Sequence, residues 1–399
     1  MAKPKLRFPE FTDEWEEKQL KDFMFFKNGL NADKDKFGSG IKFISVMDIL
    51  NNPFITYDVI RGKVNIDEKT LDNYSVSYGD VLFQRSSETR EDAGKSNVYL
   101  DKEKIATFGG FVIRGKKIGD YSPEFMNSLL KSPKVRKEII SKAQGAQHIN
   151  VGQETLENVS VVLPAVKEQQ KIADFLSSVD DIIQVQEEEI STLEEQKKGT
   201  MQKLFNREVR FKADDGSEYP EWEEKKIGDI FDFVNGKAHE KSISENGKYI
   251  VVNSKFISSG GKVKKFSNNQ ICPLKKNDIV MVMSDVPNGK AMSKCFLIDS
   301  DDKYTLNQRI CSLRTKMLAG YFIYQISRNK YFMKFDDGVS QTNLRKEEVL
   351  RCPLNVPCIE EQQKIADCLS AYDEAIQVKK DKLEVWKEIK KGLLQQMFV

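Results

Sequence analysis

Two short stretches of the chain carry residue types that enzymes use for methyl transfer and for phosphate binding. Asn51-Asn52-Pro53-Phe54 lacks the first proline of the Asn-Pro-Pro-aromatic turn that directs polar groups at an adenine amino nitrogen, and no Gly-rich loop for S-adenosylmethionine precedes it. Gly94-Lys95-Ser96 could end a phosphate-binding loop, but Thr89 stands where that loop needs its leading glycine. We interpret residues 51–54 as a turn, we expect no phosphate-binding loop at residues 94–96, and we predict no catalytic residue in this chain.

Histidine and cysteine are too sparse for most metal or acid–base chemistry. The chain has only two histidines, His148 and His239, and its six cysteines all lie between Cys272 and Cys368 without a CxxC pair. We therefore expect no metal site, and we expect free, partly buried thiols in a reducing compartment. No long apolar run and no signal-peptide pattern occurs, so we expect a cytoplasmic protein without membrane contact.

An internal repeat organises the whole chain and therefore positions its functional residues. Residues 168–185 (EQQKIADFLSSVDDIIQV) and 361–378 (EQQKIADCLSAYDEAIQV) are identical at 13 of 18 positions. Residues 15–29 (WEEKQLKDFMFFKNG) align in the same way with 222–236 (WEEKKIGDIFDFVNG). Two copies thus share their beginnings and ends, while their middles differ. We predict a domain at 1–165, a helix at 166–206, a second domain at 207–358 and a second helix at 359–399.

The shared ends are predicted to be long helices that pair with each other. Apolar residues recur there at alternating steps of three and four, and polar residues interrupt both copies at equivalent places, which fixes register. At about 1.5 Å per residue each helix would be roughly 55–57 Å long. We predict an antiparallel coiled coil with pseudo-two-fold symmetry, whose seam is Leu176, Val179, Ile183, Ile190, Leu193, Leu204, Leu369, Tyr372, Ile376, Leu383, Trp386, Leu393 and Met397.

The middles are predicted to be mixed α/β, which makes the fold class α+β. Residues 41–49, 249–257, 80–83 and 278–281 have strand patterns. Residues 121–143 and 321–334 are predicted helices, and a polar turn follows each of them.

A motif at the start of each helix identifies a family. Pro164 precedes Glu168, Gln169, Ile172, Ala173 and Leu176, and the same pattern returns as Pro357 with Glu361, Gln362, Ile365, Ala366 and Leu369. Asp180 and Asp373 follow seven residues after each alanine, and residues 79–82 (GDVL) open a strand, whereas Asn277 replaces the glycine in the second copy. Over essentially all 399 residues the chain resembles the specificity subunit of type I restriction–modification enzymes.

The resemblance implies a DNA reader without an active site of its own. Each middle would be a target recognition domain that reads one half of a bipartite, asymmetric site in double-stranded DNA. The helical spacer would dock two methyltransferase (modification) subunits, and restriction/translocase subunits would complete the complex. S-adenosylmethionine, ATP and Mg would bind to those partners, so we expect no cofactor in this chain.

Polar and basic residues of the middles are the candidate DNA contacts. Arg and Asn can bond to base edges, whereas Lys and Ser more often hold phosphates. The candidates in the first middle are Arg85, Ser86, Thr89, Arg90, Lys95, Gln144, Gln147 and His148. Those in the second middle are Lys255, Lys262, Lys264, Lys265, Asn288, Lys290, Arg309, Ser340, Gln341, Thr342 and Asn343.

The net charge of +2 conceals a basic surplus outside the helices. Residues 168–206 have a net charge of −5 and residues 361–399 of zero, which leaves +2 over 1–167 and +5 over 207–360. Because this surplus is modest, we expect the chain alone to bind DNA weakly and to bind tightly only with its methyltransferase partners.

Two other interpretations stay open at this point. The recognition subunit of another bifunctional restriction–modification class shares this duplicated layout. A non-catalytic coiled-coil adaptor that binds only proteins would have the same helices, but it would show no salt-sensitive DNA binding.

Overall fold

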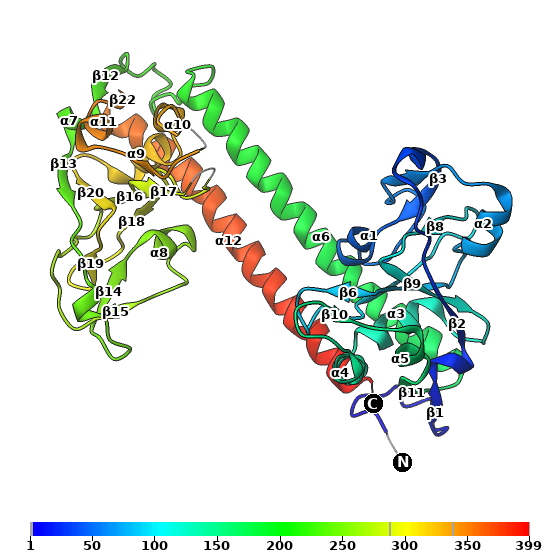
Figure 1. Ribbon diagram of the computed structural model, residues 1–399. Helices are drawn as coiled ribbons and strands as arrows, with labels where there is room; N and C mark the ends of the chain where they lie inside the picture. The colour runs from blue at the N-terminus through cyan, green and yellow to red at the C-terminus, as the bar shows by residue number, and fades with distance from the viewer. Residues whose placement is uncertain (1–2, 287–288, 337–338, 399) are drawn as a thin grey trace. The chain divides into compact units, whose positions relative to one another are not determined.

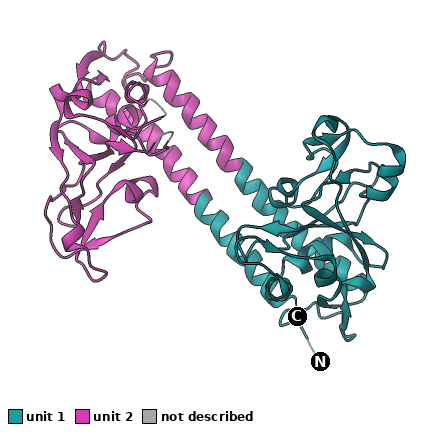
Figure 2. Ribbon diagram, viewed as in Figure 1, with its two compact units in different colours: residues 1–188, 380–399 teal, residues 189–379 magenta. Residues whose placement is uncertain are grey.

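The computed structural model describes residues 3–286, 289–336 and 339–398 (Figure 1). The chain forms two compact units, the first made of residues 1–188 with 380–399 and the second of residues 189–379 (Figure 2). Two long helices, α6 (Val166–Phe205) and α12 (Ile359–Gln396), each contribute to both units. The units thus divide the chain differently from the four segments expected from the sequence, and that four-part division stays a prediction.

The first unit is built on a four-stranded antiparallel sheet and a three-stranded sheet. The larger has the order β2 (Met24–Asn28), β9 (Val112–Lys117), β5 (Val81–Gln84), β7 (Ser96–Val98). The smaller has the order β4 (Gly62–Val64), β3 (Phe37–Ile44), β8 (Thr107–Phe108). Two short pairs complete the strands, β1 (Glu16–Gln19) with β11 (Ser160–Leu163) and β6 (Ser86–Ser87) with β10 (Ile149–Asn150).

The helices of the first unit cover these sheets and connect their strands. They are η1 (Leu20–Asp22), η2 (Lys34–Lys36), α1 (Val46–Leu50), α2 (Glu68–Tyr74), α3 (Pro123–Lys131), α4 (Pro133–Lys142) and α5 (Gln153–Glu157). The side chains of α3 enter the main core with those of α6, and the α12 end joins them through Met397 and Phe398.

The second unit repeats this topology strand by strand. Its larger sheet has the order β13 (Asp232–Asn235), β20 (Ile310–Arg314), β16 (Ile279–Val282), β18 (Cys295–Leu297). Its smaller sheet has the order β15 (Phe266–Ser267), β14 (Tyr249–Val252), β19 (Tyr304–Leu306). The short pairs are β12 (Glu223–Lys226) with β22 (Pro353–Val356) and β17 (Ser284–Asp285) with β21 (Thr342–Asn343).

The helices described in the second unit follow the order of the first, except that none corresponds to α2. They are α7 (Ile227–Ile230), η3 (Glu240–Ser242), α8 (Ser254–Ser258), α9 (Ala319–Ile326), α10 (Lys330–Met333) and α11 (Lys346–Leu350). Middles that look unrelated in sequence therefore share one fold. The prediction of two mixed α/β domains with long helices is confirmed.

Two predicted strands are half wrong, because local capping turns the chain into a helix. Residues 41–49 give a strand only as far as Ile44, and residues 249–257 only as far as Val252. The Ser45 backbone N–H and hydroxyl both donate to the Asp48 carboxylate at 2.7 Å. The Asn253 side chain accepts from the Phe256 N–H at 2.9 Å. These caps satisfy free amides at the first turns of α1 and α8, so the helix replaces the strand.

The two predicted helices of the middles are also interrupted. Residues 121–143 break at Ser132, which lies before Pro133 and has a ψ of 147°, because proline disfavours a helical conformation in the residue before it. Residues 321–334 break between α9 and α10, where Arg328 has a φ of +56°. The sequence pattern thus predicted the helices but missed both breaks.

Within each unit the long helices pair antiparallel, as predicted. In the first unit Asp180 of α6 pairs with Lys390 of α12, and further along α6 Glu187 bonds to Lys387 at 2.8 Å, closer to the start of α12. In the second unit the equivalent residues, shifted by 193 positions, make the same ion pair, between Lys197 and Asp373 at 2.5 Å. All the predicted seam residues are buried or half-buried.

The start of each long helix is anchored by a buried carboxylate. Glu168 is 1% exposed and accepts from Arg7 at 2.7 and 2.8 Å and from the Trp15 indole at 3.3 Å. Glu361 repeats these contacts with Arg210 at 3.2 and 2.9 Å and with the Trp222 indole at 2.8 Å. A buried charge is stable only with such partners, so each contact fixes a long helix to the segment that precedes its domain.

The glutamine that follows each of these glutamates closes the connection to the preceding strand. Gln169 donates to the Pro164 carbonyl at 2.9 Å and accepts from the Ser122 N–H at 3.0 Å. Gln362 donates to the Pro357 carbonyl at 2.8 Å. The Glu-Gln motif of both copies is therefore structural.

We expect Glu361→Gln to lower the free energy of unfolding by about 3–5 kcal/mol, because Arg210 would lose its buried charge partner. Urea unfolding of the full chain measures this. The matched control is Asp214→Asn, since the Lys364–Asp214 pair is exposed and its loss should cost less than about 1 kcal/mol. Equal losses in the two variants would contradict the anchoring role of Glu361.

Lys131 gives the first unit a stability that depends on pH. Burial lowers the pKa of Lys131 to about 8 from the ordinary 10.5, Lys390 lowers it further and Asp180 opposes the shift. Below pH 8 both the folded and unfolded chains carry the proton, so the burial penalty is fully present. Between pH 8 and 10.5 Lys131 loses its proton in the folded chain but keeps it in the unfolded chain, so the free energy of unfolding rises with pH.

We therefore expect Lys131→Met to stabilise the protein at pH 7 and to lose about 1–2 kcal/mol of that advantage by pH 10. Urea unfolding of both proteins at the two pH values measures the difference. A constant advantage across this range would show that Lys131 stays protonated in the fold.

Candidate DNA-recognition sites

In the second unit, four segments that are distant in sequence line one polar cavity of about 470 Å³. They are the start of α8 (Asn253, Ser254), the β17 region (Ser284, Asp285, Val286), the connection from β19 to β20 (Asn307, Gln308, Arg309, Ile310) and Gln341. The Gln341 amide donates to the Ser284 hydroxyl at 2.7 Å, beside the β17–β21 pair. The structure thus brings together two predicted contacts, Arg309 and Gln341.

Arg309 is the residue of this cavity best suited to read a base. Its side chain is exposed, and none of the described residues bonds to it. Its backbone has a φ of +65°, and its carbonyl accepts from the Met283 N–H at 2.9 Å. Such a backbone costs about 1–3 kcal/mol, and residues of this kind cluster at ligand sites. A free guanidinium can bond to both acceptors of a guanine edge.

The remaining predicted contacts that the structure describes in the second unit are not among the residues that line this cavity. Lys255, Lys262, Lys264, Lys265 and Lys290 are exposed, and none of them lines the cavity. Ser340 and Asn343 are exposed, whereas Thr342 is buried and donates to Asp336 at 3.2 Å. Asn288 lies outside the described residues.

In the first unit, the loops that were predicted to contact DNA meet through the β6–β10 pair. The Ser86 hydroxyl donates to the Asn150 side chain at 2.5 Å, and the Asn150 and Gln144 backbones pair. Gln147 and His148 are exposed in the turn between them. The Arg85 guanidinium is exposed and donates to the Gly110 carbonyl at 3.4 Å.

Thr89, Arg90 and Lys95 are exposed, but the loop that carries them is held against α4. Arg136 donates to the carbonyls of Glu91, Ala93 and Gly94 at 3.0, 2.7 and 2.8 Å. Arg90 bonds to the Ile140 carbonyl at 3.4 Å and Lys95 to Asp92 at 2.6 Å. Local contacts thus occupy both cations.

Gly94 belongs to this packing and not to a phosphate site. Its φ is +64°, and a Cβ there would lie 2.5 Å from the Ile139 side chain. A phosphate-binding loop of this kind leads into a helix, whereas here Ser96 begins strand β7.

Sequence reasoning missed a second cavity, of about 440 Å³, in the first unit. It is lined by Leu30, Asn31, Ala32, Phe37, Phe43, Ser45, Val46, Met47, Gly109, Gly110, Phe111 and Val112. None of these side chains is charged, and none belongs to the predicted contacts. The predicted contacts are polar and basic residues, so this mostly apolar set was not among them. An alignment of the connections before β9 and β20, which places Phe111 opposite Arg309, would have found the site.

The strand that leads into each site is fixed by a buried aspartate. Asp278 accepts two hydrogen bonds from Arg314, both 2.7 Å. Asp80 accepts backbone N–H groups of Ser77 and Lys117, although burial raises the pKa of the Asp80 carboxyl. The residues before them, Gly79 and Asn277, have φ values of +89° and +70°. Asn tolerates this region better than most residues, which is consistent with its replacing glycine in the second copy.

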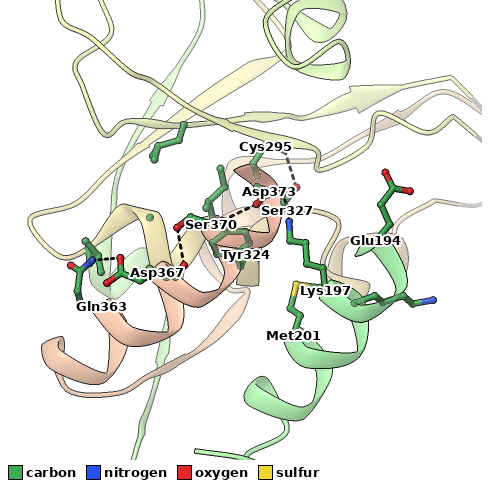
Figure 3. A pocket seen from close by; sticks show the side chains of 16 residues that line it. Glu194, Lys197, Met201, Cys295, Tyr324, Ser327, Gln363, Asp367, Ser370 and Asp373 are labelled. Atoms are coloured by element: carbon green, nitrogen blue, oxygen red, sulfur yellow. Dashed lines mark hydrogen bonds and ion pairs between the residues drawn. The ribbon is translucent and has the colours of Figure 1, made fainter. Parts of the chain in front are cut away.

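A third cavity, of about 590 Å³, lies in the second unit beside the helix pair (Figure 3). Glu194, Lys197 and Met201 line it from α6, Tyr324 from α9, and Gln363, Asp367, Ser370 and Asp373 from α12. Asp373 accepts from Lys197 at 2.5 Å and from the Tyr324 hydroxyl at 2.8 Å. Burial and the Asp373 charge raise the pKa of Tyr324. No predicted DNA contact lines this cavity.

The cysteines are free thiols, as predicted, and three of the six are buried. Burial raises the pKa of Cys311 and of Cys352 to about 12, so both stay protonated at neutral pH. Among the described residues no group of three or more His, Cys, Asp or Glu side chains could hold a metal ion. Within the same ranges no helix is long and apolar enough to cross a membrane.

Comparison with known proteins gives consistent matches. The family model for the type I restriction modification DNA specificity domain matches residues 12–195 and 219–387. The type I restriction enzyme MjaVIII specificity subunit of Methanocaldococcus jannaschii is 28% identical over 298 residues, which cover 69% of this chain and 67% of that protein. A protein of the same organism, named as the MjaX specificity subunit, is 24% identical over 98% of this chain and 94% of its own length.

A solved structure shows the same fold. The type I restriction–modification system S subunit from M. genitalium superposes with a TM-score of 0.59 at 15% identity, over 100% of this chain and 99% of that one. The two family matches cover both copies of the repeat and most of the sequence. The chain therefore belongs to the family of type I restriction–modification DNA specificity subunits.

Proposed function

We propose that each unit reads one half of a bipartite, asymmetric DNA site, and that the chain directs adenine methylation and restriction by its complex to that site. One observation carries this proposal: two domains with the same topology have different side chains at the same loop position. The connection before β20 has Gln308 and Arg309, whereas the connection before β9 has Gly110 and Phe111. Equal scaffolds with unequal loops suit two different half-sites.

The helices have the opposite property, which suits a partner that binds twice. Residues 168–185 and 361–378 are identical at 13 of 18 positions, so a partner would meet nearly the same surface in both copies. We assign this surface to two copies of the methyltransferase subunit. The MjaVIII and MjaX proteins are themselves named as subunits of restriction enzymes, which supports an assembly of this kind.

In the proposed complex this chain binds and orients DNA, and the bond chemistry takes place on the partner subunits in the cytoplasm. S-adenosylmethionine, ATP and Mg would bind there, and restriction/translocase subunits would complete the assembly. Arg309 and Gln341 would contact base edges, whereas exposed lysines such as Lys255 and Lys290 would contact phosphates. The modest surplus of +5 over residues 207–360 supports limited affinity without partners.

We expect Arg309→Ala to weaken specific DNA binding by the complex of this chain with its methyltransferase by ~1–3 kcal/mol, because a bidentate base contact is lost. Arg85→Ala tests the first unit in the same way. Fluorescence anisotropy over a salt series measures both, and Arg351→Ala, another exposed arginine, is the matched control. Unchanged affinity and unchanged site preference in both variants would contradict these assignments. An absence of salt-sensitive binding in the wild type would favour an adaptor that binds only proteins.

We expect single-molecule sequencing of DNA methylated by the wild-type complex to show two different half-sites with a fixed spacer of several base pairs. The two units differ at their loops, so the two half-sites should differ in sequence. The helices α6 and α12 both contribute to the two units, so the number of base pairs between the half-sites should be constant. A continuous or palindromic motif would contradict the proposed division of reading between the units.

A further inference from the structure

Each of the two candidate cavities has a wall that is equivalent to one wall of the other, so Phe111 and Arg309 can be compared directly. Ser45 and Asn253 cap equivalent helices, and residues 109–112 correspond to 307–310. The Gly109 N–H donates to the Ile44 carbonyl at 3.0 Å, and the Asn307 N–H to the Val252 carbonyl at 3.1 Å. The Phe111 and Arg309 carbonyls each accept a backbone N–H at 2.9 Å, from Arg85 and Met283. The two side chains therefore stand at the same place in the fold.

The chemistry at that place is apolar in the first unit. Phe111 is 72% exposed, Met47 59% and Phe37 43%, and all three line the same cavity. Large apolar side chains gathered on a surface mark a contact site, because leaving them in water is unfavourable. The cavity therefore suits a ligand that offers an apolar group.

One wall of this cavity is closely packed. A site that distinguishes one chemical group from another needs such a wall. A Cβ on Gly109 would lie 2.6 Å from the Phe43 ring, and one on Gly110 would lie 1.9 Å from the Asn31 side chain. A larger residue at either position would require Phe43 or Asn31 to move, so the connection that presents Phe111 lies tightly against the rest of the cavity. Arg85 donates to the Gly110 carbonyl and places a cation beside the apolar surface.

A protein partner that binds both copies alike does not suit this position. Such a partner would find Phe111 in one unit and Arg309 in the other, whereas residues 168–185 and 361–378 offer it nearly the same surface twice. A DNA site with two different halves suits this position, because each half would meet different side chains. In the major groove the only apolar group on a base edge is the C5-methyl of thymine, and phenylalanine is among the side chains that contact it.

We propose that the cavity around Phe111 reads the C5-methyl group of a thymine in the half-site of the first unit, at the position where Arg309 reads a guanine in the other half. This inference rests on the proposed function and names the chemistry of its reading site. Phe111 and Met47 contact the methyl group, and Arg85 contacts the edge of a neighbouring base.

Replacing thymine by uracil tests this contact, because it removes only the methyl group. Duplexes that carry the methylated motif are prepared with each thymine of one half-site changed in turn to uracil, and binding to the complex with methyltransferase is titrated. We expect one substitution to weaken wild-type binding about 4-fold, the ratio for burying one methyl group. Phe111→Ala should bind the thymine duplex more weakly and no longer distinguish it from the uracil duplex.

Phe25→Ala is the matched control, since Phe25 is 60% exposed on β2 but does not line the cavity, and it should keep full discrimination. Methylation by the Phe111→Ala complex should relax one position in one half-site only. Because Phe111 is exposed, this variant should unfold at the wild-type temperature, which a thermal melt checks.

Three results would overturn the inference. They are a wild-type complex indifferent to every uracil, a Phe111→Ala complex that still distinguishes uracil, and a loss of methyltransferase binding by Phe111→Ala in the absence of DNA. The last result would assign the cavity to a protein partner. In each case a bipartite wild-type motif would leave the proposed function intact, whereas a continuous motif would remove the function itself.

Discussion

The rest of the structure depends on one buried carboxylate in each copy, Glu168 and Glu361. Removing a charge from water costs several kcal/mol, and only well-placed donors offset it. Here an arginine supplies two hydrogen bonds and a tryptophan a third, all from the segment that precedes the domain. A purely apolar contact could be as stable but would allow sliding. The charged contact has one geometry, so each domain holds a single orientation on the start of its helix.

The covalent repeat is not the folding unit. The core of the first unit contains Ile172 and Leu176 from the start of α6 together with Met397 and Phe398, which directly follow α12. The core of the second contains Ile365 and Leu369 from α12 together with Leu204 from α6. The end of the helical segment of each copy therefore packs into the core of the other unit. This exchange explains why the polar residues of the seam, Lys197 and Lys390, recur at equivalent places: each needs an aspartate from the opposite helix.

The sequence predicted what is periodic or repeated, and it failed where single contacts decide. The long helices follow from a heptad pattern, and their pairing from the interruptions that both copies share. The change from strand to helix at Ser45 and Asn253 depends on one cap each, and the break at Ser132 on one proline. The cavity around Phe111 escaped prediction for a related reason. It is assembled from segments that lie up to about eighty residues apart, none of which carries a local pattern of its own.

The same scaffold can hold different reading chemistry because the reading residues lie outside the core. Phe111 and Arg309 belong to connections between strands, and neither side chain enters a buried cluster. Their backbones nevertheless differ. Arg309 has a φ of +65°, whereas Phe111 keeps an ordinary negative φ. A bulky residue is strained at positive φ, so phenylalanine at position 309 would not reproduce the apolar site. Transfer of the apolar site to the second unit thus requires exchange of the whole connection, with the glycines that shape it, and not of one side chain.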